Sequence, residues 1–191
     1  MTGGKNQMNR KVLHSENSAL VIVDVQEAFR TVIGDFSTMT AKICTVIEGA
    51  KLLGIPLVVT EQYPRGLGST VEELSLILPD DLKCFEKSSF GIMGDETIRA
   101  TVDGLGKRQI VVCGLETHVC VSQSCHQLLD AGYDVFLLED AVASRFESDR
   151  ITGLERLRAA GVVITSVEAM LFEGMRDSKY PNFKEIQALV K

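Results

Sequence analysis

The stretch IVVCGLETHVC, residues 110–120, joins a strand pattern directly to a helix pattern. Residues 110–114 have the apolar character and length of a buried strand, and the residues after them begin a run with helical spacing. Cys120 therefore falls in the first turn of a helix, where unpaired backbone N–H groups and the helix dipole favour negative charge. A thiol in this position is biased toward the thiolate, so we predict that Cys120 is a nucleophile.

The alternation of strand and helix patterns continues along the chain. Apolar runs predict strands at residues 19–23, 57–60, 82–85, 109–114, 134–138 and 162–165. Helical spacing predicts helices at about residues 38–53, 95–104, 117–131 and 148–160. Strands this apolar are buried on both faces, so the sequence predicts an α/β fold in which helices cover both sides of a six-stranded, mostly parallel sheet.

Composition limits the classes of function. The chain has 191 residues, 45% of them hydrophobic, and a net charge of −6, which favours neither nucleic acid nor an anionic membrane as a partner. No apolar run approaches the roughly 20 residues that span a bilayer. The five cysteines are an odd number without a CxxC motif, so we expect free thiols in an intracellular, most simply cytoplasmic, protein that acts on a small molecule.

The two ends of the chain differ from its body. Residues 1–17 are polar and are predicted to be a flexible tail, with a mitochondrial presequence as the alternative, and residues 18–191 form one domain. Near the C-terminus, Asn182 is a candidate N-cap for a short helix over residues 184–190. The apolar side of that helix is expected to pack on the body of the protein or on another subunit.

Three polar residues are predicted to meet at one edge of the sheet. Asp24 ends the first strand, Lys87 follows the third and Cys120 lies just beyond the fourth. Ligands of parallel sheets bind at the carboxyl ends of the strands. There Asp24 can take the thiol proton, Lys87 can stabilise negative charge, and the backbone N–H groups of Glu116 and Cys120 can face an oxyanion. These roles describe a covalent hydrolase that needs no histidine.

Three segments carry a resemblance to a known family. LVIVDVQ at 20–26, KSSF at 87–90 and CGLETHVCV at 113–121 are similar to the signature regions of the isochorismatase-like cysteine hydrolase superfamily, over about residues 18–170. The resemblance implies a three-layer, Rossmann-like α/β/α fold and a catalytic triad of Asp24, Lys87 and Cys120. It also implies a cis peptide bond between Leu115 and Glu116, and a homo-oligomer.

The substrate class is narrowed by what the chain lacks. Nicotinamidases of this superfamily carry a metal site after the second strand, but this chain has TEQYPR at 60–65, and none of its histidines is near that segment. A true isochorismatase must bind a doubly anionic substrate, for which only Arg65 and Arg145 are candidates. We therefore expect no metal and no cofactor, and hydrolysis of a small amide or related acyl compound through a thioester.

Several further residues have both a functional and a structural interpretation. His118 is too close to Cys120 in sequence to face it, so we interpret it as a pocket-lining or capping residue and not as a base. The cysteines other than Cys120 are interpreted as buried small hydrophobic residues. The remaining candidates for the pocket wall, which are equally compatible with core or subunit contacts, are Phe29, Tyr63, Phe90 and Val119.

Two alternatives to the hydrolase follow from the same sequence. The first is a catalytically idle protein of the same fold that binds a partner through its N-terminal tail or C-terminal helix. The second is a dinucleotide-binding oxidoreductase, which is disfavoured because no GxGxxG motif follows the first strand.

Overall fold

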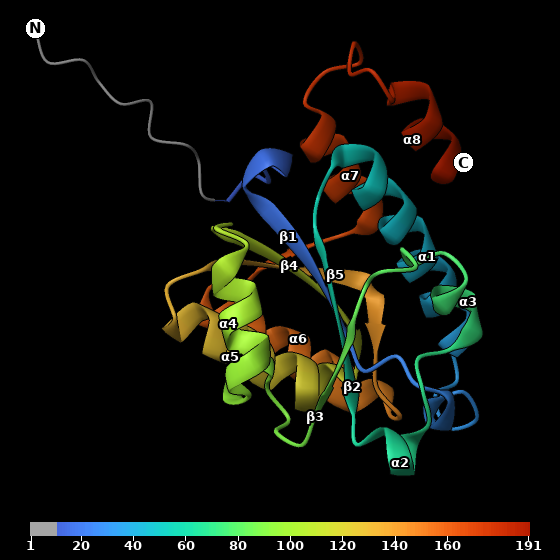
Figure 1. Ribbon diagram of the computed structural model, residues 1–191, viewed down its shortest axis with the longest axis vertical. Coiled ribbons are helices and arrows are strands. Elements are labelled where there is room, and N and C mark those ends of the chain that lie inside the picture. Colours follow the sequence, from blue (N-terminus) through green and yellow to red (C-terminus); the bar gives the residue numbers. More distant parts are fainter. Residues whose placement is uncertain (1–10) are drawn as a thin grey trace, which may run out of the picture.

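The six strands of the sheet are all parallel and have the order β3-β2-β1-β4-β5-β6. The computed structural model describes residues 11–191, and Figure 1 shows the central sheet between its helices. The strands are β1 (Ser18–Val23), β2 (Leu57–Gln62), β3 (Cys84–Lys87), β4 (Gln109–Leu115), β5 (Asp134–Ala143) and β6 (Val163–Thr165). The strand order reverses between β1 and β4, which is the position where parallel sheets open a site. The predicted fold class is confirmed.

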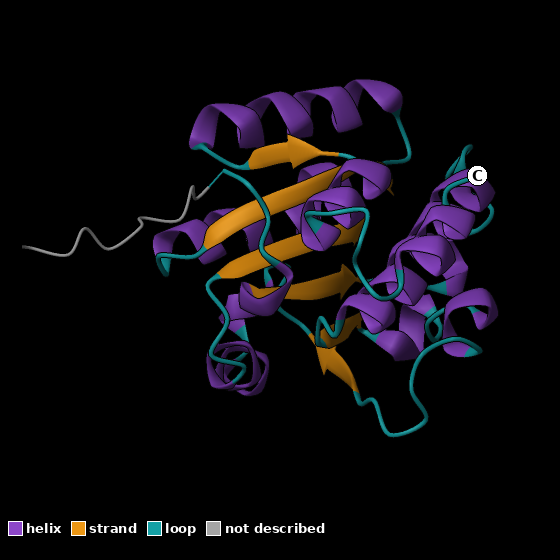
Figure 2. Ribbon diagram, turned by 90° about the horizontal axis from the view of Figure 1, so that it is seen from above, coloured by secondary structure: helices purple, strands orange, loops and turns teal. Residues whose placement is uncertain are grey.

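Helices cover both faces of the sheet, which gives three layers (Figure 2). They are α1 (Phe36–Leu53), α2 (Pro64–Leu67), α3 (Glu72–Ser75), α4 (Glu96–Gly104), α5 (Ser122–Asp130), α6 (Glu147–Ala160), α7 (Val167–Met175) and α8 (Phe183–Leu189). Alternate residues of β1 belong to two different cores. Leu20 and Ile22 pack with α1 and α7, whereas Val21 and Val23 pack with α4 and α5. None of the helices described over residues 11–191 has the length and apolar character needed to cross a membrane.

Several elements differ from the prediction: the fifth strand continues to Ala143, and the short helices α2 and α3 were not predicted. The third strand was predicted at 82–85 but spans Cys84–Lys87, so Lys87 ends the strand instead of following it. The helix predicted at 117–131 begins with a π-helical turn, Thr117–Val121, before α5. Helix α7 was not predicted, although Ser166 caps it by accepting a hydrogen bond from the Ala169 N–H at 3.3 Å.

The predicted flexible tail lies partly outside the described residues, because residues 1–10 are not among them. Residues 11–17 are packed, which differs from the prediction. The Leu13 side chain is fully buried, and the Gln109 side chain binds this segment through the His14 N–H at 2.7 Å and the Val12 carbonyl at 2.9 Å. The packed domain therefore begins before residue 18, because the buried Gln109 at the start of β4 binds residues 12 and 14.

Helix α8 docks on the body of the same chain. Ile186 is fully buried, and Phe183 and Val190 pack against the core that contains α1. The Asn182 side chain makes no N-cap hydrogen bond and instead donates to the Leu52 carbonyl at 2.8 Å. The predicted cap is therefore wrong, because this amide joins α8 to the end of α1.

Candidate active site

Asp24 lies directly after β1 in a left-handed backbone conformation, with φ of 53°. Its N–H donates to the Thr60 carbonyl at 3.1 Å, which keeps it aligned with β2. The carboxylate is buried, and its Oδ1 accepts a hydrogen bond from Thr60 Oγ1 at 2.7 Å. These contacts, made by the neighbouring strand, fix a conformation that non-glycine residues rarely adopt.

Gly114 allows β4 to approach the end of β1. It has φ of 113°, and a Cβ atom there would lie 2.1 Å from the Val23 carbonyl oxygen. Gly114 is also the register partner of Val23, the residue before Asp24. The glycine therefore brings the segment that carries Cys120 next to the segment that carries Asp24.

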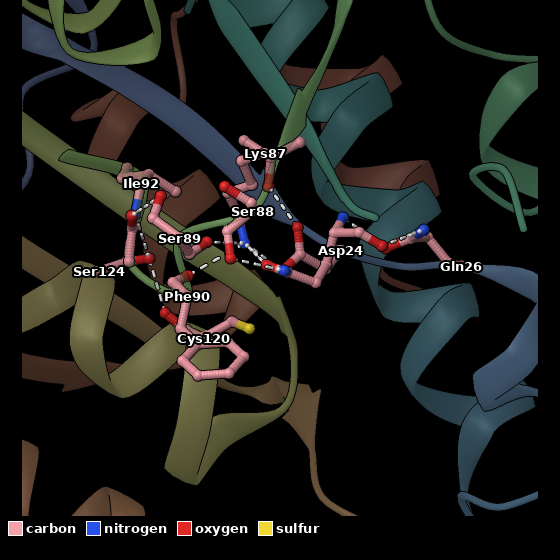
Figure 3. A network of polar contacts seen from close by, with 12 residues as sticks. Asp24, Gln26, Lys87, Ser88, Ser89, Phe90, Ile92, Cys120 and Ser124 are labelled. Carbon is pink, nitrogen blue, oxygen red and sulfur yellow. Dashed lines mark hydrogen bonds and ion pairs between the residues drawn. The ribbon is translucent and has the colours of Figure 1, made fainter. Parts of the chain in front are cut away.

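Lys87 is buried at the end of β3, with its side chain 0% exposed. Its Nζ lies 2.6 Å from Asp24 Oδ2 and donates to Gln62 Oε1 at 2.8 Å. The carbonyls of Phe90 and Ser89 lie at 3.0 and 3.2 Å from the same nitrogen. An ammonium has three N–H donors, so these acceptors satisfy Lys87 within the protein (Figure 3).

Cys120 lies in the π-helical turn between β4 and α5 and is only 7% exposed. Ser124 holds this turn, because its Oγ donates to the Cys120 carbonyl at 2.6 Å and accepts from the Ile92 N–H at 3.1 Å (Figure 3). Ser124 thereby joins the turn of Cys120 to the loop that follows Lys87. The three residues predicted to carry the chemistry are thus on connected segments at the switch point of the sheet.

The electrostatic setting of Cys120 differs from the expected bias toward thiolate. Burial, followed by the negative charge of Asp24, raises the pKa of the Cys120 thiol to about 12. The charge of Lys87 lowers this pKa, whereas a hydrogen bond with Asp24 and the charge of Glu116 raise it further. Desolvation and the two carboxylates outweigh Lys87, so the resting group is a thiol beside a carboxylate that can accept its proton.

The turn between β4 and Cys120 is tied to the loop after β5. The buried Glu116 carboxylate accepts hydrogen bonds from the Arg145 N–H at 3.0 Å and from Arg145 Nε at 3.1 Å. Thr117 Oγ1 donates to the Ala143 carbonyl at 3.0 Å. The predicted cis bond between Leu115 and Glu116 is wrong: residues 11–191 contain no cis peptide bond. The bond has the trans form that non-proline peptide bonds almost always take.

His118 is directed away from the nucleophile by the same loop. Its Nδ1 lies 3.0 Å from Ser144 Oγ, and its Nε2 lies 3.8 Å from Asp149 Oδ2. These contacts agree with the interpretation that His118 is not the base for Cys120. They give it a role in joining the turn to the start of α6.

The predicted pocket-wall residues fall into two groups. Tyr63 and Phe90 are 61% and 52% exposed, which is unusual for large aromatic side chains. Phe29 and Val119 are partly buried against the two cores. Tyr63 and Phe90 both lie beside Lys87, since the Tyr63 N–H donates to the Lys87 carbonyl at 3.0 Å and Lys87 Nζ binds the Phe90 carbonyl.

A separate cavity of about 420 Å³ opens at the carboxyl end of β5, next to the start of α1. Arg145 lines it and connects it to Glu116, but Asp24, Lys87 and Cys120 are not among its lining residues. Both acidic and basic side chains face it. They include Asp35, Lys42, Asp140, Glu147 and Arg150.

The polar side chains at the end of β2 are hydrogen bonded within the protein. Glu61 Oε1 accepts hydrogen bonds from the Thr70 N–H at 2.6 Å and from Thr70 Oγ1 at 2.7 Å, and the Gln62 amide binds Lys87. Residues 11–191 contain no cluster of three or more His, Cys, Asp or Glu side chains arranged to hold a metal ion. The side chains of Glu61 and Gln62 are thus engaged within the protein.

Sequence reasoning did not identify the two glutamines of the site. Gln26, fully buried after β1, and Gln62, at the end of β2, are hydrogen bonded to each other and to the segments around Lys87. Gln26 lies within the LVIVDVQ segment, but nothing local to either residue shows that they would meet. Their contact depends on the pairing of β1 with β2.

Comparison with known proteins agrees with this geometry. Residues 18–169 match the model of the isochorismatase domain, and the chain belongs to the isochorismatase family. It is 41% identical to the secreted isochorismatase effector Isc1 of Phytophthora sojae, over 100% of this chain and 91% of that protein. It is 37% identical to the isochorismatase domain-containing protein 2 of Danio rerio, over 93% of this chain and 89% of that protein.

Solved structures show the same fold. The MAR1 ribonuclease of Caenorhabditis elegans superposes with a TM-score of 0.89 at 35% identity, covering 94% of this chain and 92% of that one. The YcaC protein of Escherichia coli, described as an octameric hydrolase of unknown specificity, superposes with a TM-score of 0.83 at 22% identity. That match covers 93% of this chain and 95% of YcaC, and it supports the fold alone.

Proposed function

We propose that the protein is a cysteine hydrolase that cleaves a small amide or a related acyl compound through a thioester on Cys120. The observation that carries this proposal is the buried pair of Lys87 and Asp24 at the carboxyl end of β1, next to β4, the strand that leads to Cys120. The negative charge of Asp24 raises the pKa of the Cys120 thiol, which supports Asp24 as its base. A base in contact with a thiol, and a cation held in contact with that base, are the groups that covalent acyl transfer requires.

In the proposed reaction, Cys120 Sγ attacks the substrate carbonyl carbon while its proton passes to the Asp24 carboxylate. The tetrahedral intermediate collapses, the C–N bond breaks, and Asp24 returns the proton to the leaving amine. A water molecule then attacks the thioester and gives a proton to Asp24. When the C–S bond breaks, that proton returns to Sγ and the carboxylic acid leaves. The backbone N–H groups of Glu116 and Cys120 are the proposed oxyanion donors.

The raised pKa of Cys120 supports proton transfer during the attack instead of a preformed thiolate. Lys87 has no N–H left for a substrate, because its acceptors are all supplied by the protein. Its proposed role is therefore to keep Asp24 oriented and to offset its charge. No step of the proposed reaction needs a metal or another cofactor.

Trapping of the covalent intermediate tests this function. The protein is mixed with a panel of small amides and esters, quenched in acid, and analysed by peptide mass spectrometry. We expect an acyl group on Cys120 and release of ammonia or an amine. Cys120→Ser abolishes both, whereas Cys125→Ser, at a fully buried position on α5, changes neither. Turnover that persists in Cys120→Ser would contradict the proposal.

The alternative, a catalytically idle protein that binds a partner, is an outcome of the same test. It requires that no compound acylates Cys120 and that partner binding is insensitive to Cys120→Ser.

Ribonuclease activity, after the name of the C. elegans protein, is tested by adding RNA to the panel. The net charge of −6 does not favour binding of a phosphate backbone.

We also propose that the protein acts inside the cell, most simply in the cytoplasm, as a homo-oligomer. The five free cysteines support a reducing compartment. YcaC is octameric, and the exposed side chains of Tyr63 and Phe90, two residues that contact Lys87, offer apolar surface to a second copy. Cell fractionation and light scattering test these two proposals.

A further inference from the structure

The end of β2 places an uncharged amide against the buried lysine. Gln62 is the register partner of Lys87, and its Oε1 accepts a hydrogen bond from Lys87 Nζ at 2.8 Å. Its Nε2 donates to the Ser88 carbonyl at 3.0 Å. The second bond distinguishes the two ends of the amide, because only the NH₂ group can donate to a carbonyl. The amide oxygen is therefore the atom that faces the ammonium.

Gln26 fixes the backbone that carries this amide. The Gln62 N–H donates to Gln26 Oε1 at 2.8 Å, and Gln26 Nε2 donates to the Gln62 carbonyl at 3.1 Å. Gln26 Nε2 also donates to the Gly68 carbonyl at 2.6 Å. The Gln26 side chain is fully buried, so water does not compete for these bonds. Gln62 is thus held at its backbone and at both ends of its side chain.

The acceptors around Lys87 differ in charge. Among residues 11–191, Asp24 is the only charged side chain that accepts a hydrogen bond from Lys87 Nζ, and Gln62 Oε1 and the Phe90 carbonyl are neutral. A neutral acceptor orients the ammonium without competing with Asp24 for its charge. A second carboxylate in place of the amide would share the lysine and leave excess negative charge beside Asp24 and Cys120.

We propose that Gln62 is a positioning residue for the reaction. Its backbone is hydrogen bonded to Gln26, and its uncharged amide oxygen orients Lys87 toward Asp24. Because this acceptor carries no charge, Asp24 remains the counter-ion of Lys87. This inference rests on the proposed function and deepens it. Gln62 acts through Lys87 and touches no reacting atom.

Two substitutions close to glutamine in volume test the role of the amide. Gln62→Glu keeps an acceptor and adds a charge, whereas Gln62→Met removes the acceptor. The measured quantity is the rate of Cys120 alkylation by iodoacetamide, followed by peptide mass spectrometry across a pH series. We expect Gln62→Glu to slow alkylation about tenfold at fixed pH and to shift the pH profile upward by about one unit. Gln62→Met is expected to slow it about tenfold, the effect of one hydrogen bond to a charged group.

The matched control is Gln123→Glu, which adds the same charge at an exposed position on α5. It is expected to leave the rate and the pH profile unchanged, because solvent screens that charge. Circular dichroism verifies that each variant is folded. A purely structural role would lower thermal stability in both Gln62 variants and leave the alkylation profile of the folded protein unchanged.

The outcomes separate this inference from the proposed function. If amides acylate Cys120 but both Gln62 variants are alkylated like the wild type, the inference is overturned and the hydrolase stands. If the Gln62 variants slow alkylation as expected but no compound acylates Cys120, the positioning of Lys87 is supported and the hydrolase fails.

Discussion

Lys87 Nζ lies 2.6 Å from Asp24 Oδ2, and both side chains are at most 1% exposed. An ion pair buried to this extent is costly to break on one side, because the remaining charge has neither water nor a partner. The pair therefore links the chemistry of the site to the stability of the fold.

We predict that Lys87→Met lowers the free energy of unfolding by about 3–5 kcal/mol, the usual effect of leaving one buried charge unpaired. The double variant Asp24→Asn with Lys87→Met is expected to be more stable than Lys87→Met alone, because it has no unpaired charge. Urea denaturation measures both. Lys42→Met, at a half-exposed pair with Asp140 at 3.7 Å, is the control and should change stability by less than about 1 kcal/mol. Equal losses in the single and double variants would argue against this role of the pair.

We predict that alkylation of Cys120 keeps rising with pH above the usual thiol range, because the pKa of its thiol is raised to about 12. Asp24→Asn removes a charge that raises this pKa, so it should increase the rate of alkylation at a given pH while abolishing turnover. Lys87→Met removes the charge that lowers the pKa and should slow alkylation. Peptide mass spectrometry gives the rates, and a profile that levels off near pH 8.5, the reference value for a free thiol, would contradict the prediction.

We predict that Gly114→Ala is destabilising by several kcal/mol or prevents folding. A Cβ atom at this position would lie 2.1 Å from the Val23 carbonyl, and the backbone has φ of 113°. Gly104→Ala, inside α4 with no atom within 4 Å of the added Cβ, is the control and should be neutral or slightly stabilising. Thermal unfolding compares the two, and a normal melting temperature for Gly114→Ala would show that the strands can separate here.

We predict that Ser124→Ala slows acylation and lowers stability by about 1–3 kcal/mol, because it leaves the buried Ile92 N–H without its acceptor. The matched control is Thr101→Ala on α4, which removes an exposed hydroxyl that also donates four residues back, to the Thr97 carbonyl at 2.8 Å. That control should change stability by less than about 0.5 kcal/mol. Stopped-flow acylation and urea denaturation are the measurements. Indistinguishable behaviour of the two variants would mean that Ser124 does not hold the turn of Cys120.

Much of the fold was predictable because its signals are local. Apolar runs such as residues 109–114 mark buried strands, and glycines such as Gly54 and Gly161, with φ of 67° and 103°, end α1 and α6. The start of β3 and helix α7 were not predicted. Their placement depends on pairing with β2 and on packing against α1, which no window of sequence contains.

By itself, the sequence determined the alternation of strands and helices and placed Asp24 and Cys120 after the first and fourth strands. That these two strands are neighbours came from the tertiary structure. Only the tertiary structure decided their electrostatics. Burial and the Asp24 carboxylate raise the pKa of Cys120, the opposite of the direction expected from its helix position alone. The tertiary structure also brought Gln62 to Lys87 and Gln26 to Gln62. The pKa of a buried group depends on all the atoms and charges near it in space, whereas the pattern that predicts a strand or a helix depends only on residues that are near in sequence.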